Sequence, residues 1–133
     1  MTRYMLDTNT VSGLIREQPN VVRRVISVPM ASLCISAVTA GELHYCLAKR
    51  PEAKRLQALV WEFLLRVDVL PWDAGIAEHY GAVRAEIARC GKPLAPLDML
   101  IAAHALGSNA VLVTNDRTFA QVPALRIEDW TAA

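Results

Sequence analysis

Near its start the chain reads Arg3-Tyr4-Met5-Leu6-Asp7-Thr8-Asn9. Tyr4 to Leu6 form a short apolar run, which predicts a buried strand that ends at Asp7. Residues 9–17 follow with apolar side chains at helical spacing, so a helix begins almost as soon as the strand ends. A strand that leads directly into a helix is the opening half of a β-α-β unit, which indicates a parallel sheet.

The same alternation of strand and helix continues along the chain. Further short strands are expected at residues 32–35, 67–70, 111–113 and, at the sheet edge, 125–127. Further helices are expected from Pro19 to just before Pro29 and over residues 37–48, 52–66, 74–90 and 96–106. This order predicts an α/β fold in which helices cover both faces of a mostly parallel sheet.

Length and composition describe one ordinary domain spanning residues 1–133. The net charge is +1, from 14 basic and 13 acidic residues, so overall charge does not mark a nucleic-acid binder. The three cysteines lack C-x-x-C spacing, which fits reduced thiols, and no apolar stretch approaches the ~20 residues of a membrane span. We therefore expect a cytoplasmic protein with no membrane segment.

Four acidic residues fall where this fold would bring them together: Asp7, Glu42, Asp98 and Asp116. Asp7 and Asp116 follow apolar strands, while Glu42 and Asp98 lie in the opening turns of apolar helices. Ligands of open α/β sheets bind at the carboxyl ends of the strands. Carboxylates gathered there repel one another unless a cation joins them, and ligation by oxygen alone suits Mg²⁺ or Mn²⁺.

Each acid also has an ordinary structural explanation. Asp7 could cap the helix that follows it, and Thr39-Ala40-Gly41-Glu42 matches a capping box. Asp98 could favour a helix N-terminus, and Asp116 could belong to a turn before a short helical segment. The joint pattern favours the metal site, because an acid buried in an apolar helix without a partner would be costly.

Four motifs that contain these acids resemble, in chain order, the signatures of PIN-domain ribonucleases. Within that family, the residues of the motifs and the length of the chain are similar to those of the VapC toxins. The motifs are Met5-Leu6-Asp7-Thr8-Asn9, Ser36-x-x-Thr39-x-x-Glu42-Leu43, Asp98-x-x-Ile101-Ala102 and Val113-Thr114-Asn115-Asp116. The resemblance covers essentially the whole chain. It implies a three-layer α/β/α sandwich with a sheet of four or five strands, and a Mg²⁺-dependent endoribonuclease that acts on structured RNA. Among such RNAs the tRNA anticodon region, that of initiator tRNA above all, is the leading candidate.

The resemblance also implies a set of partners. These are a VapB-type antitoxin, a second copy of the chain in a homodimer, and operator DNA reached only through the antitoxin. One departure concerns the metal: some PIN domains carry a further acid after the Asn-Asp pair, whereas Arg117 follows Asp116 here. The sequence therefore does not support a second tightly held ion.

The residues suggest a division of labour within the motifs. Asp7, Asp98 and Asp116 would hold Mg²⁺ directly or through water, and Glu42 would orient or deprotonate the attacking water. Supporting residues are expected beside the acids. Thr8 or Asn9 could fix Asp7 by hydrogen bonding, and Thr114 or Asn115 could do so at the opposite strand end.

Basic residues form two clusters. Lys49, Arg50, Lys54 and Arg55 fall at the turn between two helices, where a solvated helix end and a phosphate-binding patch are both possible. Arg84, Arg89 and Lys92 could line another approach to the site.

Two other functions compete with the nuclease. Asp7-Thr8-Asn9-Thr10 is similar to the D-x-D-x-T signature of haloacid-dehalogenase-like phosphohydrolases, but Asn9 replaces the second acid and the chain is short for that fold. The other alternative is a non-catalytic RNA- or protein-binding domain that uses its acids only as helix caps.

Overall fold

The computed structural model describes residues 1–91 and 93–132. Its sheet has five parallel strands in the order β3-β2-β1-β4-β5. This confirms the predicted parallel sheet. The strands are β1 (Tyr4–Leu6), β2 (Leu33–Ser36), β3 (Asp68–Leu70), β4 (Val111–Val113) and β5 (Ile127–Glu128).

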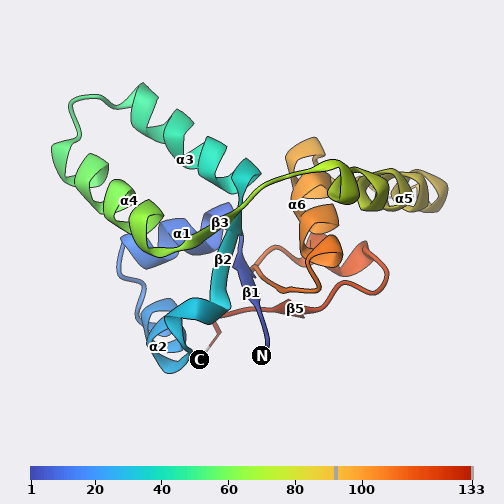
Figure 1. Ribbon diagram of the computed structural model, residues 1–133, viewed down its shortest axis with the longest axis horizontal. Helices are drawn as coiled ribbons and strands as arrows, with labels where there is room; N and C mark the ends of the chain where they lie inside the picture. Colours follow the sequence, from blue (N-terminus) through green and yellow to red (C-terminus); the bar gives the residue numbers. More distant parts are fainter. Residues whose placement is uncertain (92, 133) are drawn as a thin grey trace.

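The helices lie close to their predicted positions, with turns η1 (Met30–Ser32) and η2 (Arg117–Gln121) beside them. Pro19 occupies the first turn of α2, and Gly91 ends α5 in the left-handed conformation at φ 67°. The helices are α1 (Thr8–Ile15), α2 (Pro19–Ser27), α3 (Ala37–Lys49), α4 (Lys54–Arg66), α5 (Ala74–Cys90) and α6 (Pro96–Gly107). Figure 1 shows α3 and α4 on one side of the sheet and α5 and α6 on the other.

The fifth strand lies slightly later than the sequence predicts, at Ile127–Glu128 rather than residues 125–127. A turn at residues 123–124 comes first, with Ala124 in the left-handed region at φ 66°. The chain then needs two more residues before Ile127 pairs with Leu112 of β4. Backbone conformation at this turn, and not hydrophobicity, sets where the strand begins.

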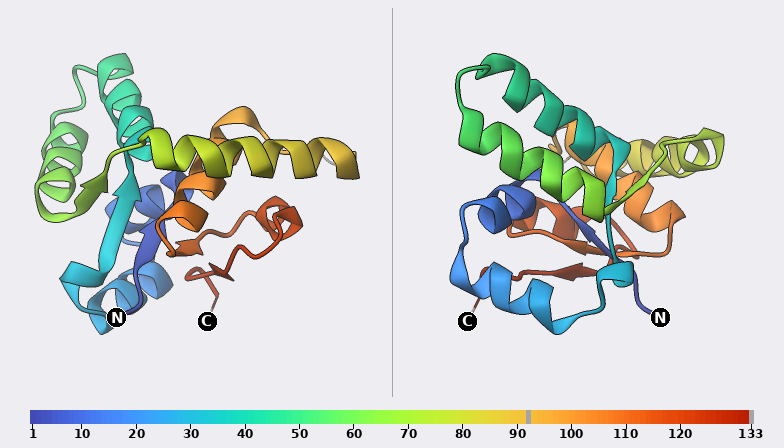
Figure 2. Two further views of the ribbon diagram at one scale, coloured as in Figure 1. Left: turned by 45° about the vertical axis from the view of Figure 1, so that its right-hand side comes forward. Right: turned by 60° about the vertical axis from the view of Figure 1, so that its left-hand side comes forward.

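Side chains of successive strand residues point to opposite faces of the sheet, and this alternation produces the predicted three layers. Met5 of β1 packs into a core with α5 and α6, whereas Leu6 packs into a second core with α1, α2, α3 and α4. Cys34 and Ile35 of β2 divide between the two cores in the same way. Figure 2 shows these two groups of helices on opposite sides of the sheet.

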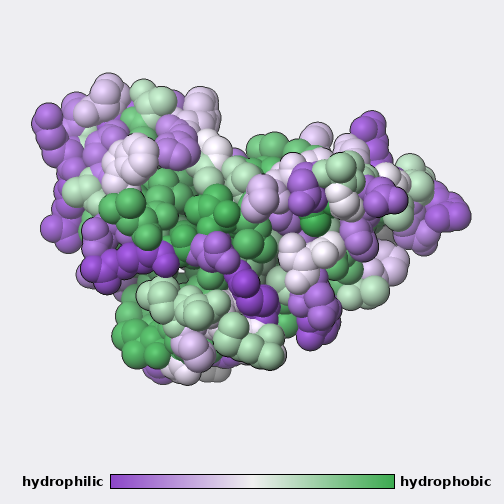
Figure 3. All heavy atoms as spheres, viewed as in Figure 1, coloured by the Kyte–Doolittle hydropathy of each residue, from purple (hydrophilic) through white to green (hydrophobic). Residues whose placement is uncertain are grey.

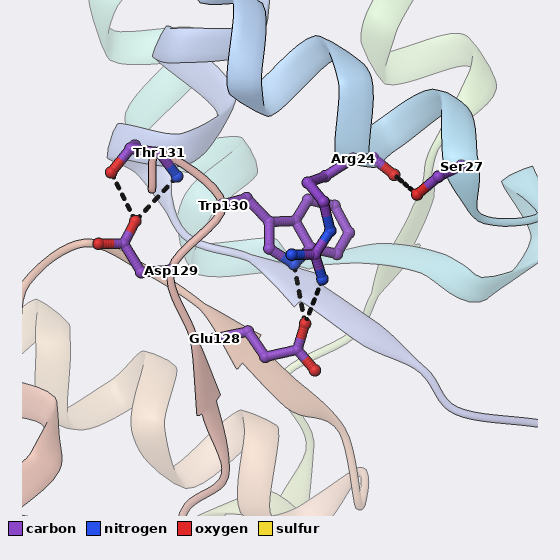
Figure 4. Close-up of polar contacts among 6 residues, drawn as sticks. All are labelled: Arg24, Ser27, Glu128, Asp129, Trp130 and Thr131. Carbon is purple, nitrogen blue, oxygen red and sulfur yellow. Dashed lines mark hydrogen bonds and ion pairs between the residues drawn. The ribbon is translucent and has the colours of Figure 1, made fainter. Parts of the chain in front are cut away.

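The end of the chain is fastened to α2 through Trp130, which is 1% exposed. Its ring lies 5.2 Å from the Tyr4 ring and 5.2 Å from the guanidinium of Arg24, measured to the ring centroids. The Trp130 indole (2.9 Å) and Arg24 (2.8 Å) both donate to Oε1 of Glu128 in β5 (Figure 4). Packing, cation–π attraction and a shared acceptor thus hold the edge strand against α2.

A buried polar contact joins the two layers near the carboxyl edge of the sheet. Nδ1 of His104 in α6 lies 2.7 Å from the Ser36 hydroxyl, which also caps α3 by accepting from the Val38 N–H. The His104 residue is 1% exposed, so its ring reaches Ser36 from inside the protein and this polar contact is shielded from water.

We predict that His104 makes the fold acid-sensitive. Burial lowers the pKa of His104, more than Asp73 and the Pro71 carbonyl raise it. The unfolded chain therefore binds the proton more tightly, so this contribution to stability is present above pH ~6.5 and is lost as pH falls through the folded pKa. The free energy of unfolding, measured by urea titration, should fall by up to ~1.4 kcal/mol per pH unit in that window.

His104→Gln should remove this dependence of the unfolding free energy on pH. His79→Gln, at an exposed position of α5, should leave the dependence in place. Equal slopes in the two variants would show that His104 is not the sensitive group.

Candidate active site

The order of the strands fixes where a site can form. From β1 the chain moves to β2 and β3 on one side of the sheet, then crosses to β4 and β5 on the other side of β1. The connections therefore diverge between β1 and β4, and ligands of such sheets bind outside the carboxyl ends of the strands at that point. Asp7 follows β1 there, and Asp116 follows β4 three residues after Val113.

Asp7 is the most enclosed of the four acids, with 4% of its surface exposed. Its Oδ1 accepts from the N–H of Thr10 at 2.8 Å, which makes it the N-cap of α1. Its own N–H donates to the carbonyl of Val113 at 3.1 Å, and the Thr10 hydroxyl donates to the same carbonyl at 3.0 Å. The ends of β1 and β4 and the start of α1 therefore share one hydrogen-bond cluster.

Asp116 sits on the turn that leads into η2 and is half-buried. Its N–H donates to the Thr114 hydroxyl at 3.0 Å. Its Oδ1 accepts both the N–H (2.9 Å) and the hydroxyl (2.7 Å) of Thr118. A side-chain hydrogen bond also links Thr114 to Asp7, so this buried threonine contacts both acids, whereas Asn115 is exposed.

Glu42 reaches the site from the second turn of α3. Its Oε1 accepts from the Thr8 hydroxyl at 2.6 Å. Two expectations are corrected here. Ser36, not Thr39, caps α3, so the capping-box explanation of Glu42 is wrong. Thr8, which could have fixed Asp7, instead holds Glu42, because its place at the start of α1 faces α3.

The structural roles of two further residues, Thr10 and Ser36, were not predicted from the sequence. Thr10 anchors both Asp7 and β4, and Ser36 carries the contact to His104. Thr10 could have been found, because the N–H three residues after a capping acid is a common partner of its side chain. Ser36 and His104 lie far apart in sequence, and nothing in the local pattern announces their contact.

Asp98 lies in the first turn of α6, after Pro96 in the sequence, and is half-buried. The pKa of Asp98 is raised above its usual range, first by burial and then by the negative charges of Asp116, Asp7 and Glu42. The structure thus brings all four predicted acids into one electrostatic field, although they come from four distant segments of the chain.

The pKa of Asp7 is raised for similar reasons. Burial is the largest cause, and the charge of Asp116 adds to it. Hydrogen bonds from Thr114 and Thr10 favour the ionised form and oppose the shift. The fold thus orients this carboxylate well but leaves its charge poorly compensated.

The spacing of these acids decides which kind of metal ion they can hold. Within residues 1–91 and 93–132, no three His, Cys, Asp or Glu side chains stand close enough to grip an ion together as placed. A cage of protein ligands, as structural zinc needs, is therefore not formed. Mg²⁺ makes a different demand, because it keeps several waters and takes only one or two carboxylates together with substrate phosphate. The four carboxylates, whose charges act on one another, offer the oxygen ligands that a hydrated Mg²⁺ takes.

Comparison with known proteins agrees with this geometry. Residues 4–125 match the PIN domain family. The chain is 42% identical over 132 residues to the tRNA(fMet)-specific endonuclease VapC of Shigella flexneri, with 98% of this chain and 100% of that protein covered. It is 36% identical over 131 residues to Ribonuclease VapC2 of Haemophilus influenzae, with 98% and 99% covered.

A solved structure agrees as well. A chain in the crystal structure of DNA-bound VapBC from Salmonella typhimurium superposes with a TM-score of 0.88 at 40% identity, over 98% of this chain and 99% of that one. PIN-domain nucleases generally use a divalent metal, in keeping with the oxygen donors gathered here. The chain belongs to the PIN-domain family and, within it, to the VapC ribonucleases, the toxins of VapBC toxin–antitoxin pairs.

Proposed function

We propose that Asp7, Glu42, Asp98 and Asp116 form the active site of this ribonuclease and work with Mg²⁺, for which Mn²⁺ can substitute. The observation that carries the proposal is the convergence of the four acids at the carboxyl ends of β1 and β4 and the opening turns of α3 and α6, where burial and the charges of the other three acids raise the pKa of Asp98. Repulsion of this kind destabilises the protein alone and is offset when a cation binds. A helix cap needs no such gathering of like charges.

The four acids divide the work. Asp7, Asp98 and Asp116 hold the hydrated ion, directly or through water. When bound, the ion supplies positive charge to the phosphodiester and to the developing charge on the attacking water. Glu42 stands apart through its bond with Thr8 and is the base that orients or deprotonates that water. Thr114 supports Asp7 and Asp116 at the strand ends.

The proposed substrate is initiator tRNA, cut in its anticodon region. Support comes from the relatives of Shigella flexneri and Salmonella typhimurium, which are named tRNA(fMet)-specific endonucleases and are 42% and 41% identical to this chain. Both matches cover 98% of the chain, so they include all four acids' segments. The anticodon region is the part of that RNA to which the family resemblance points.

The proposed partners are a VapB-type antitoxin and a second copy of the chain, with operator DNA bound only through the antitoxin. Solved relatives from Rickettsia felis and Salmonella typhimurium are VapBC complexes with DNA. Leu59 and Leu65 of α4 and Val69 of β3 are 38%, 79% and 37% exposed. Figure 3 shows hydrophobic residues across the middle of the face viewed in Figure 1, and such a surface is suited to a protein partner.

The proposed location is the cytoplasm, where the RNA substrate is found. None of the helices in the described ranges combines the length and the apolar character needed to span a bilayer. Family membership removes the main support for a haloacid-dehalogenase-like phosphohydrolase, whereas a domain that only binds RNA or protein is tested by the cleavage assay below.

We expect the protein to cut purified tRNA(fMet) in Mg²⁺ and to lose this activity in chelator. Asp98→Asn should lower the rate at least a hundredfold, because it removes one charge from the proposed cation site and changes little else. Gel analysis of end-labelled tRNA measures both effects, with elongator tRNA(Met) as the control substrate. Full cleavage by the variant would place the active centre elsewhere, and no cleavage by clean wild type would favour a binding domain.

The same substitution should stabilise the metal-free fold. Because the pKa of Asp98 is raised, the folded protein loses stability as pH rises through that pKa, and an uncharged Asn avoids the loss. At pH 7 in chelator the melting temperature of the variant should therefore lie above that of wild type, by a few degrees at most, as single substitutions in a domain of this size do. The gain should vanish below pH ~4.

Glu52→Gln, at an exposed position before α4, is the matched control and should change little. An Asp98→Asn variant that melts below wild type at pH 7 would contradict the repulsion on which the proposal rests.

Thr8 should matter for turnover and not for substrate binding. Thr8→Val keeps the side-chain shape but removes the hydroxyl that fixes Glu42, so kcat should fall at least tenfold while KM stays near its wild-type value. Thr8→Ser restores the hydroxyl and should recover most of the rate. Equal kcat values in steady-state assays of Val and Ser variants would show that Glu42 does not depend on this bond.

A further inference from the structure

Arg84, an exposed residue of α5, is linked by a series of contacts to α6, the helix that carries Asp98. Its Nη1 donates to the Tyr80 hydroxyl at 3.0 Å. The Tyr80 ring meets the Trp72 ring edge-on, with the centroids 5.9 Å apart. The Trp72 indole donates to the carbonyl of Leu100 at 3.0 Å. Leu100 lies in α6, the helix that carries Asp98, so Arg84 is positioned relative to that acid.

The charge of Arg84 is not neutralised by these contacts. Its partner Tyr80 is neutral, and within residues 1–91 and 93–132 no ion pair involves Arg84. Arg89, further along α5, is instead paired with Glu86. Lys92, which the sequence places in the same cluster, lies outside the described residues. Arg84 therefore combines a fixed position with a charge that is available to an anion.

Arg84 also borders a hollow that reaches the first turn of α6, the turn that carries Asp98. This pocket of about 350 Å³ lies between the last turns of α5 and the first turn of α6, with Leu94 and Met99 in its wall. Met99 directly follows Asp98 in the sequence. The hollow is at the small end of the range for ligand pockets, and its lining is apolar except for Arg84.

The acidic edge creates a need that Arg84 can meet. Four carboxylates repel a polyanionic substrate, so RNA must be held by positive charge close to them but outside the cation site. A guanidinium suits this task, because its planar fork donates two hydrogen bonds to one phosphate. Resting on the function proposed above, we propose that Arg84 binds a backbone phosphate of the RNA beside the cleaved bond and that Tyr80 positions it.

The test measures tRNA binding separately from cleavage. Asp98→Asn is used as the non-cleaving background, and the Kd for labelled tRNA(fMet) is measured by fluorescence anisotropy in Mg²⁺ at several salt concentrations. Arg84→Ala is added to this background, with Arg89→Ala as the matched control, since it removes the same charge from the same helix. Tyr80→Phe removes only the hydroxyl that holds Arg84.

We expect Arg84→Ala to raise Kd about tenfold and to reduce the slope of log Kd against log salt by ~0.7–1, the change for one lost phosphate contact. Arg89→Ala should change neither value, and Tyr80→Phe should raise Kd about threefold. In the cleavage assay Arg84→Ala should raise KM and leave kcat near wild type.

Two results would overturn the proposal. One is an Arg84→Ala variant that binds like the Arg89→Ala control with an unchanged salt slope; the other is a background protein that binds no tRNA. Wild type that binds tRNA but does not cleave it would reject the proposed function, while the binding series would still decide the role of Arg84.

Discussion

Asp7 is a carboxylate buried at the point where the chain crosses from one half of the sheet to the other. A charged group in this position is unfavourable, and the fold holds it with hydrogen bonds from the start of α1 and from Thr114 after β4. These bonds orient the carboxylate without neutralising it, and the charge of Asp116 increases the cost. The other elements are arranged around this unfavourable charge, since α3 and α6 add Glu42 and Asp98 to the same field.

The supporting structure is rigid because it is built from both faces of one sheet. Neighbouring strand residues enter different cores, as Met5 and Leu6 do, so each face of β1 is packed against helices. The contact between His104 and Ser36 then joins α6 to the start of α3 across the carboxyl edge. The acids are therefore presented by strand ends and helix turns whose positions are set by packing, as a preorganised site requires.

Much of this arrangement could be read from local sequence. Short apolar runs and helical periodicity were sufficient to place β1, β4 and the helices. Because ligands of parallel sheets bind at the carboxyl ends of the strands, the positions of the acids after strands and at helix starts predicted that they lie at one edge of the sheet. The hydrogen bond between Thr8 and Glu42 could not be read, because it depends on how α1 packs against α3. The same holds for His104 with Ser36, whose partners are 68 positions apart, and for the start of β5, which a left-handed residue determines.

The two outer strands have a consequence for how copies of the chain can meet. β3 has three residues, carries exposed Asp68 in an ion pair with Arg3, and is followed at once by Pro71. β5, at the opposite margin, has two residues. Short, charged and proline-flanked edges discourage continuation of a sheet from one molecule into the next. The edges of the sheet therefore offer no surface for association between copies, and cross-β stacking of the native molecule is disfavoured.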